Sequence, residues 1–254
     1  MPRYRLTIEY DGSGLVGWQR QANGVSVQQA LETAIANFCG ESATVHGAGR
    51  TDAGVHALAQ TAHVDLAHTV APEVLRSAVN YHLRPAKIAV LAAESVPPCF
   101  DARLSATGRI YLYRILNRRG PPALERGRVW HVSQPLDVDA MRRGSSHLVG
   151  HHDFSTFRDS LCQARSPLKT LDVLEPRRVG EEIRIEARAR SFLHHQVRNI
   201  VGTLKLVGLG QWHPDDVARA LAARDRRAGG PTAPPDGLFL VEVRYPAVFD
   251  ACES

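Results

Sequence analysis

Apolar and polar side chains alternate along the first residues of the chain. Every second residue from Tyr4 to Tyr10 is apolar, and polar residues stand between them. This period of two is typical of a strand with one buried face, so we predict a strand over 3–10. Ser26 and Gln29 then resemble a capping box, and apolar residues recur behind them at helical spacing. This pattern predicts an amphipathic helix over 26–39.

The same patterns continue and then restart after Pro97-Pro98. In the first half we predict strands near 43–48 and 60–66, a helix from Pro72 to about Tyr81, and a strand from Lys87 to Ala93. In the second half we predict a strand over 109–117, a helix over 137–148, strands over 170–177 and 182–191, helices over 193–208 and 214–223, and a final strand over 238–244. Both halves are therefore expected to be α+β.

A chain of 254 residues is long enough for one large domain or for two domains of ordinary size. Similar strands and helices occur on either side of the proline pair, although no repeat is visible residue by residue. We therefore predict two similar α+β lobes, an N-terminal lobe over 1–105 and a C-terminal lobe over 106–254.

The four cysteines are far apart, and none belongs to a Cys-x-x-Cys pair; they are Cys39, Cys99, Cys162 and Cys252. We therefore expect neither a disulfide framework nor a structural zinc site. The first residues lack the apolar region of a signal peptide, and no apolar run approaches the ~18 residues of a membrane span. These features predict a cytoplasmic protein without a membrane segment.

Lysine and arginine number 31 against 26 aspartates and glutamates, which gives a formal net charge of +5. Most of the positive charge is arginine, whose planar guanidinium binds phosphate through two bonds and stacks on bases. The balance therefore favours a nucleic-acid partner. A genome rich in G and C would also favour arginine over lysine, so composition leaves both explanations open.

One loop combines glycines with groups that carry chemistry. The segment from Gly47 to Ala57 reads GAGRTDAGVHA and holds Arg50 and Asp52. Glycine permits positive φ and close backbone approach, so such a loop can present a carboxylate and a guanidinium where a bulky substrate comes near. The alternative is a polar turn whose arginine and aspartate form a weak surface ion pair with each other.

Six segments resemble the tRNA pseudouridine synthase A (TruA) family and occur in that family's order from residue 3 to about 246. They are RYRLTIEYDGSGLVGWQRQANGVSVQQALE, GAGRTDAGVHA, FDARLSATGRIYLYRI, GHHDFSTFR, SFLHHQVRNIVG and DGLFLVEVRYP. The resemblance covers nearly the whole chain. The proline-rich stretch Pro231 to Pro235 departs from the family's usual approach to its final strand.

The resemblance implies an α+β fold with two similar lobes, whose antiparallel sheets join across a basic central cleft with helices on the outer faces. It also implies an isomerase that converts uridine to pseudouridine in the anticodon stem-loop of tRNA, at tRNA positions 38, 39 and 40. No cofactor is implied. A homodimer is expected, because the family uses both subunits to hold a tRNA that is large beside one cleft.

Pseudouridine formation breaks the N1–C1′ bond of uridine, turns the uracil and rejoins it through C5. A carboxylate beside the ribose must attack C1′ or remove the C2′ proton, as carboxylates do in glycoside chemistry. The resemblance places this carboxylate at Asp52. The two chemical routes stay open, and an N-cap for the segment after Gly54 is the alternative structural role for Asp52.

An ionised carboxylate in a pocket that excludes water needs a cation or hydrogen bonds. Arg198 lies on a predicted helix with an apolar stripe formed by Val197, Val201 and Leu204. The resemblance assigns Arg198 to an ion pair with Asp52. A solvated arginine on a helix surface is the alternative.

Tyr111 and Tyr113 share one face of a predicted strand. The resemblance makes Tyr111 the residue that contacts the substrate, stacking on the base and helping to remove the C5 proton. Leu238 and Leu240 would close the pocket on the other side. Core packing is the alternative for all of these apolar and aromatic residues.

Arg50 suits a role in extruding the target base, because a base taken out of a stack leaves a gap that a side chain can support. Whether Arg50 pushes the base or clamps its phosphate stays open. Two loops, 117–128 and 224–236, combine arginine with glycine and proline. They serve either as phosphate contacts or as solvated connectors.

The twelve histidines do not show His-Glu-x-x-His or a comparable ligand spacing, so no catalytic metal is expected. Two other function classes remain as alternatives. One is an RNA-binding or RNA-folding protein with little catalysis, which the presence of all four candidates at 50, 52, 111 and 198 disfavours. The other is a metal-dependent phosphodiesterase, which a chelator would inactivate.

Overall fold

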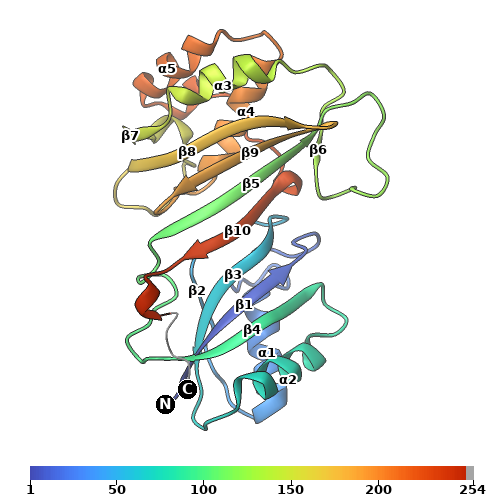
Figure 1. Cartoon of the computed structure of the whole chain (residues 1–254), viewed down its shortest axis with the longest axis vertical. Helices are drawn as coiled ribbons and strands as arrows, with labels where there is room; N and C mark the ends of the chain where they lie inside the picture. Colours follow the sequence, from blue (N-terminus) through green and yellow to red (C-terminus); the bar gives the residue numbers. More distant parts are fainter. Residues whose placement is uncertain (250–254) are drawn as a thin grey trace. The chain divides into compact units, whose positions relative to one another are not determined.

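A computed structural model describes residues 1–249 (Figure 1). The chain divides into two compact units. The first is Met1–Arg109 with the described residues of Phe239–Ser254, and the second is Ile110–Leu238. Each unit mixes helices with mostly antiparallel strands, which confirms the α+β class. The division into lobes at 1–105 and 106–254 remains a proposal. The first compact unit differs from the predicted N-terminal lobe because it also includes most of the final strand.

The first unit contains strands in the order β4-β1-β3-β10. Their bounds are β1 Arg3–Tyr10, β2 His46–Gly47, β3 His56–Asp65, β4 Ile88–Val96 and β10 Leu238–Arg244, of which Leu238 belongs to the second unit. β1 is antiparallel to β3 and β4, whereas β10 is parallel to β3. A short 3-10 turn, Ala247–Phe249, follows β10.

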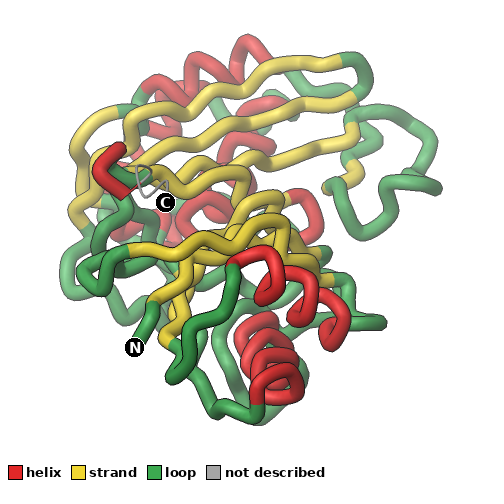
Figure 2. The backbone as a smooth tube through the Cα atoms, turned by 60° about the horizontal axis from the view of Figure 1, so that its bottom comes forward, coloured by secondary structure: helices red, strands yellow, loops and turns green. Residues whose placement is uncertain are grey.

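Two helices, α1 Val27–Cys39 and α2 Pro72–Leu83, lie on one side of these strands (Figure 2). The alternating side chains of β1 explain the arrangement, because Tyr4 to Tyr10 are buried at every second position and the residues between them are more exposed. Ser26 caps α1 by accepting from the N–H of Gln29 at 3.1 Å. The predicted first strand and first helix are therefore confirmed.

Two strand predictions in this unit need correction. The strand expected near 43–48 is only His46–Gly47, and the strand expected over 60–66 begins at His56. Pairing explains both differences. β3 follows β1 from Asp65 opposite Arg3 to Ala57 opposite Tyr10, whereas β2 pairs with β3 at two positions. A partner strand distant in sequence thus sets the length that local propensity leaves undefined.

The second unit contains strands in the order β5-β9-β8-β7, with β6 parallel to β5. The strands are β5 Gly108–Leu116, of which Gly108 and Arg109 belong to the first unit, β6 Trp130–His131, β7 Gly150–Asp153, β8 Leu168–Val179 and β9 Glu182–Ala189. The helices are α3 Val138–Ser146, α4 Gln196–Gly208 and α5 Pro214–Ala223, with 3-10 turns at Ser155–Phe157, Arg226–Ala228 and Pro235–Gly237. Sequence patterns did not predict β6 or β7, which are too short to show a period.

Helix α4 begins later than predicted. The periodicity predicted a helix over 193–208, but the first helical residue is Gln196. His195 has φ 60° and ψ 5°, the left-handed conformation, so it cannot continue a right-handed helix. The side chain of Gln196 also accepts from the N–H of Leu193 at 2.8 Å. Apolar spacing does not reveal either feature.

α4 packs closely against the loop that follows α5. A Cβ at Gly202 would lie 1.7 Å from the carbonyl oxygen of Pro231. The N–H of Ala233 donates to the carbonyl of Arg198 at 3.1 Å, and the N–H of Gly230 donates to Oγ1 of Thr203 at 2.9 Å. The carbonyl of Pro231 can therefore approach α4 this closely only because position 202 has no side chain.

In the part of the chain that the structure describes, no helix has the length and apolarity needed to cross a membrane. The described cysteines Cys39, Cys99 and Cys162 are free thiols. Cys252 lies outside the described residues.

We predict that Gly202→Ala lowers the free energy of unfolding by at least about 1–3 kcal/mol, because the methyl group must displace the backbone at Pro231. Gly120→Ala is the control, since a Cβ there meets no atom within 4 Å. Urea unfolding of both variants measures the difference. Equal stability of the two variants would contradict the close packing of α4 against this loop.

Candidate active site

The loop that carries Arg50 and Asp52 runs from β2 to β3 in the first unit. Arg50 is exposed and Asp52 is half-buried. The N–H of Ala48 donates to a β3 carbonyl at 2.8 Å. Nε2 of Gln60 donates to the carbonyl of Gly49 at 2.9 Å. The start of the loop is therefore attached to β3 by one backbone bond and one side-chain bond.

The segment before α1 and the last residue of β1 hold the middle of the same loop. The N–H of Trp18 donates to the carbonyl of Thr51 at 3.0 Å, and the hydroxyls of Tyr10 and Thr51 share a bond of 2.8 Å. Burial raises the pKa of Tyr10 to about 12, so the phenol stays protonated at neutral pH. A Cβ at Gly17, where φ is +100°, would lie 2.6 Å from the Thr51 carbonyl oxygen. The backbone beside Asp52 is thus fixed from outside the loop.

Asp52 begins a tight turn that leads into β3. Its carbonyl accepts from the N–H of Val55 at 3.1 Å. Gly54 has φ +79°, which this turn requires. The residues that follow form a strand from His56 and not a helix, so the N-cap role considered for Asp52 is wrong.

His56 is a buried residue of this region to which sequence reasoning assigned no role. Its ring stacks on Phe239 with centroids 4.6 Å apart. Its Nδ1 accepts from the N–H of Gly12 at 3.1 Å and lies 3.3 Å from Oδ1 of Asp11. His56 therefore connects the end of the glycine-rich loop to the segment after β1. Its place near the end of the segment Gly47 to Ala57 was the available signal.

Arg198 lies in the first turn of α4 and is half-buried. Its Nε donates to the carbonyl of Ala233 at 2.8 Å, and the N–H of Ala233 returns a bond to the Arg198 carbonyl at 3.1 Å. One edge of the guanidinium is therefore oriented by backbone. Arg198 belongs to the second unit, and its expected ion pair with Asp52 of the first unit remains a prediction.

The two tyrosines of β5 have different environments. Tyr113 is fully buried, and its hydroxyl donates to the carbonyl of Pro234 at 2.7 Å. Burial raises the pKa of Tyr113 well above its usual value. Tyr111 is half-buried and meets Phe192 edge to face at 5.1 Å. Tyr113 is therefore a core residue, and Tyr111 remains the candidate for substrate contact.

The remaining candidates are buried residues at the start of β10. Leu238 is 5% exposed and Leu240 is 0% exposed. Leu238 belongs to the second unit, with Arg198 and Tyr111, whereas Leu240 belongs to the first unit, with Asp52. Contact of Leu238 and Leu240 with a base remains a prediction.

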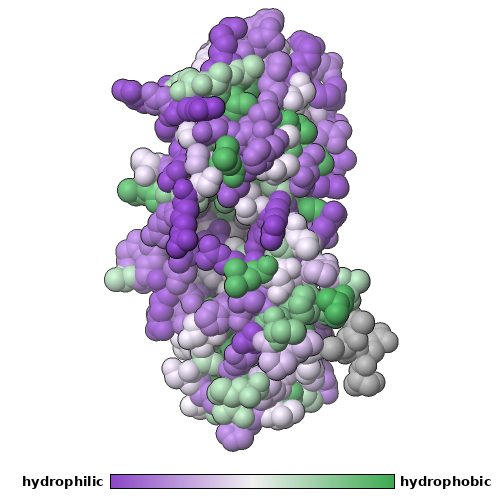
Figure 3. All heavy atoms as spheres, turned by 90° about the vertical axis from the view of Figure 1, so that its left-hand side faces the viewer, coloured by the Kyte–Doolittle hydropathy of each residue, from purple (hydrophilic) through white to green (hydrophobic). Residues whose placement is uncertain are grey.

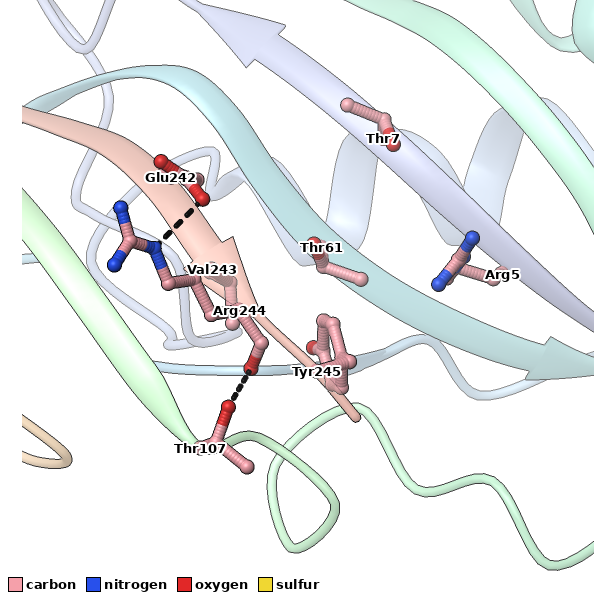
Figure 4. A pocket seen from close by; sticks show the side chains of 8 residues that line it. All are labelled: Arg5, Thr7, Thr61, Thr107, Glu242, Val243, Arg244 and Tyr245. Atoms are coloured by element: carbon pink, nitrogen blue, oxygen red, sulfur yellow. Dashed lines mark hydrogen bonds and ion pairs between the residues drawn. The ribbon is translucent and has the colours of Figure 1, made fainter. Parts of the chain in front are cut away.

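A pocket of about 410 Å³ opens on the first unit (Figure 4). Its lining is mainly polar and consists of Arg5, Thr7, Thr61, Thr107, Glu242, Val243, Arg244 and Tyr245. Both arginines are bonded to carboxylates, Arg5 to Glu94 and Arg244 to Glu242. Because each positive charge is matched, the pocket does not have the excess charge of a strong phosphate site.

The two arginine-rich loops differ in how their side chains are used. Arg119 is exposed, and Arg118 pairs with Glu181 at 2.7 Å. Arg226 instead donates to the carbonyl of Gly230 at 2.9 Å and to Oδ1 of Asn199 at 3.0 Å. Arg226 therefore stabilises its own loop.

Figure 3 shows a molecular face on which hydrophilic residues predominate and apolar residues form separate groups.

Comparison with known proteins gives consistent matches. A family model described as tRNA pseudouridine synthase matches residues 6–103 and 145–246. A tRNA pseudouridine synthase A of Paramagnetospirillum magneticum is 62% identical over 247 residues, 97% of this chain and 96% of the relative. Proteins of the same name from Rhodospirillum centenum and Sinorhizobium fredii are 64% and 57% identical, each covering 96% of this chain and 100% of the relative.

The matched ranges of the family model contain most of the candidate residues. Arg50 and Asp52 lie in the first range, and Arg198, Leu238 and Leu240 lie in the second. Position 111, on β5, falls between the two ranges and is covered only by the full-length relatives.

We predict that Gly17→Ala loosens the loop around Thr51, because its methyl group would displace the Thr51 carbonyl from the Trp18 N–H. Hydrogen exchange at the Trp18 amide should accelerate. Gly14→Ala is the matched control, since φ there is +82° but a Cβ meets no atom within 4 Å. Equal acceleration in both variants would show that backbone strain, and not the lost bond, controls this amide.

Proposed function

Because the chain belongs to the tRNA pseudouridine synthase family, we propose that it converts uridine to pseudouridine at tRNA positions 38, 39 and 40, in the anticodon stem-loop. Synthases of this kind are isomerases, acting as intramolecular transferases. Identity of 57–64% along almost the whole chain supports the proposal. The observation that carries the mechanism is the fixed backbone on both sides of Asp52.

Asp52 acts on the ribose in this proposal. Its carboxylate attacks C1′ or removes the C2′ proton as the N1–C1′ bond breaks, and the detached uracil then turns and bonds to C1′ through C5. The C5 proton leaves and N1 gains a proton, so product and substrate are isomers. A loop held by several backbone bonds suits this role, because a misplaced reacting group loses much of its rate advantage.

Tyr111 and Arg198 supply the other two catalytic roles. Tyr111 stacks on the turned base, and its hydroxyl assists removal of the C5 proton. The Phe192 edge supports this ring. Arg198 pairs with Asp52 and keeps it ionised in a pocket that excludes water. The bond to the Ala233 carbonyl limits the directions in which the guanidinium can point.

Substrate access requires the target base to leave its stack. Arg50, exposed beside Asp52, supports the vacated position. Leu238 and Leu240 provide the apolar wall against which the base rests. The proposed assembly is a cytoplasmic homodimer, because a tRNA stem is large beside a chain of 254 residues.

An RNA-binding protein with little catalysis is the competing function from another class. It would bind tRNA and leave no pseudouridine. A metal-dependent phosphodiesterase would cleave the strand and would lose activity in a chelator. Mapping pseudouridine and strand breaks in tRNA incubated with the protein, with and without excess chelator, separates all three possibilities.

We predict that Asp52→Asn abolishes turnover, because the amide is nearly isosteric but can act neither as base nor as nucleophile. Affinity for tRNA should stay within about tenfold of wild type, or ~1.4 kcal/mol. Single-turnover assays and binding titrations measure both effects. Asp172→Asn, which makes the same change at an exposed position, is the control. Activity above about one per cent of wild type, a barrier change under ~2.7 kcal/mol, would overturn the assignment.

Substitution of the loop arginines should have two different effects, one on the salt dependence of tRNA affinity and one on stability. Arg119→Ala is expected to flatten the slope of log affinity against log salt by about 0.7–0.9, the effect of one lost phosphate contact. Arg226→Ala should instead lower stability, because Arg226 binds Asn199 and Gly230. Titrations across a salt series with parallel thermal unfolding test both. An unchanged slope for Arg119→Ala would identify its loop as a solvated connector.

A further inference from the structure

The residue that precedes α4 has an unusual backbone. His195 has φ 60°, and among residues 1–249 the only other non-glycine residue with positive φ is Arg224. The left-handed conformation is sterically unfavourable for L-residues other than glycine. Such strain persists where surrounding structure enforces it, and it gathers at functional sites. Arg224 ends α5, whereas His195 stands three residues before Arg198.

A carboxylate holds the His195 side chain. Nδ1 of His195 lies 2.7 Å from Oδ2 of Asp159, and the N–H of Leu161 donates to Oδ1 of the same carboxylate at 2.7 Å. Burial alone raises the pKa of Asp159, but the bonds from Leu161 and His195 and the nearby imidazoles hold it below its usual value. Asp159 is therefore ionised at neutral pH, and both of its oxygens are bonded within its own unit.

The backbones around this pair are also bonded to each other. The N–H of Asp159 donates to the carbonyl of His194 at 3.1 Å, and the N–H of His194 donates to Sγ of Cys162 at 3.4 Å. Nδ2 of Asn199 donates to the carbonyl of Phe157 at 3.0 Å. Two segments distant in sequence, 157–162 and 193–199, are thus joined at the point where α4 begins.

These contacts converge on the residues at which the first turn of α4 begins. If His195 left the left-handed conformation, the helix would start at a different angle, and the Arg198 side chain on its first turn would move. The bond from Arg198 to the Ala233 carbonyl fixes one edge of the guanidinium, but it does not fix the start of the helix. The Asp159 bond to His195 acts on that start.

We propose that Asp159 and His195 form a positioning pair, which holds the start of α4 so that the Arg198 guanidinium is correctly oriented for the reaction. The inference rests on the proposed role of Arg198. Neither residue contacts the substrate in this proposal. Supporting groups of this kind, which orient a residue that acts directly, typically change activity 10- to 100-fold in metal sites, and we expect a similar size here.

The first test is a double-mutant cycle. Asp159→Asn should lower the single-turnover rate at saturating tRNA by about 10- to 100-fold, while tRNA affinity changes by less than about threefold. In an Arg198→Lys background, which already lacks the planar fork, Asp159→Asn should lower the rate much less. Non-additivity of this kind is expected only if Asp159 acts through Arg198. A purely structural loss would add fully to the loss in Arg198→Lys.

A second set of variants avoids dependence on Asp159→Asn folding. Asn can adopt the left-handed conformation, and its Nδ2 takes the place of the histidine Nδ1, so His195→Asn should keep most of the rate. His195→Gly adopts the same backbone conformation without the bond and should be slow. Arg224→Gly relieves the other positive φ, at the end of α5, and shows what relief of this strain alone does to stability. Thermal unfolding of each variant records stability alongside the rate.

The outcomes separate the two proposals. A wild-type rate for Arg198→Lys would show that the role proposed for Arg198 is wrong. A normal loss in Arg198→Lys, combined with an additive loss from Asp159→Asn, would overturn the positioning pair alone. Equal rates for His195→Asn and His195→Gly would also overturn it, because the bond to Asp159 would then have no effect on the reaction.

Discussion

The bonds between the start of α1 and the segment before it constrain the loop that carries Arg50 and Asp52. The N–H groups of Val27 and Gln28 lack partners within the helix and donate to the carbonyls of Gly17 and Trp18 at 3.1 and 3.0 Å. The N–H of Trp18 then donates to the Thr51 carbonyl at 3.0 Å. A helix terminus therefore fixes a loop, and that loop fixes the backbone next to the candidate carboxylate. The path works because the glycine at position 17 has no side chain in the way.

Sequence patterns predicted the elements that local periodicity defines and missed boundaries set by distant partners. The predicted bounds 214–223 and 238–244 match α5 and β10. The start of β3 at His56 depends on pairing with β1, and the start of α4 at Gln196 depends on the left-handed His195. Neither pairing nor a positive φ at histidine is visible in hydrophobic spacing. Both of these errors fall at segment ends beside candidate site residues.

Among the residues of the candidate site, too, some were predicted from the sequence and others were not. Glycine spacing drew attention to Asp52, and resemblance to a family placed Arg198 and Tyr111, but the residues that support them carried no recognisable pattern. Asp159 and His195 are 36 positions apart in sequence and meet at 2.7 Å. A pair of this kind can be found only once the chain is folded, because the supporting role depends on geometry and not on residue type.

Asp52 in the first unit and Arg198 in the second are held by the same physical means. In each, the backbone at or beside the residue is bonded to a segment distant in sequence: Thr51 to Trp18 in one unit, and Arg198 to Ala233 in the other. Backbone bonds fix the position from which each side chain extends, and contacts of the side chain itself, such as the Arg198 Nε bond to the Ala233 carbonyl, then restrict its χ angles. The orientation of each group is then settled on folding, so the entropy of ordering it need not be lost during the reaction.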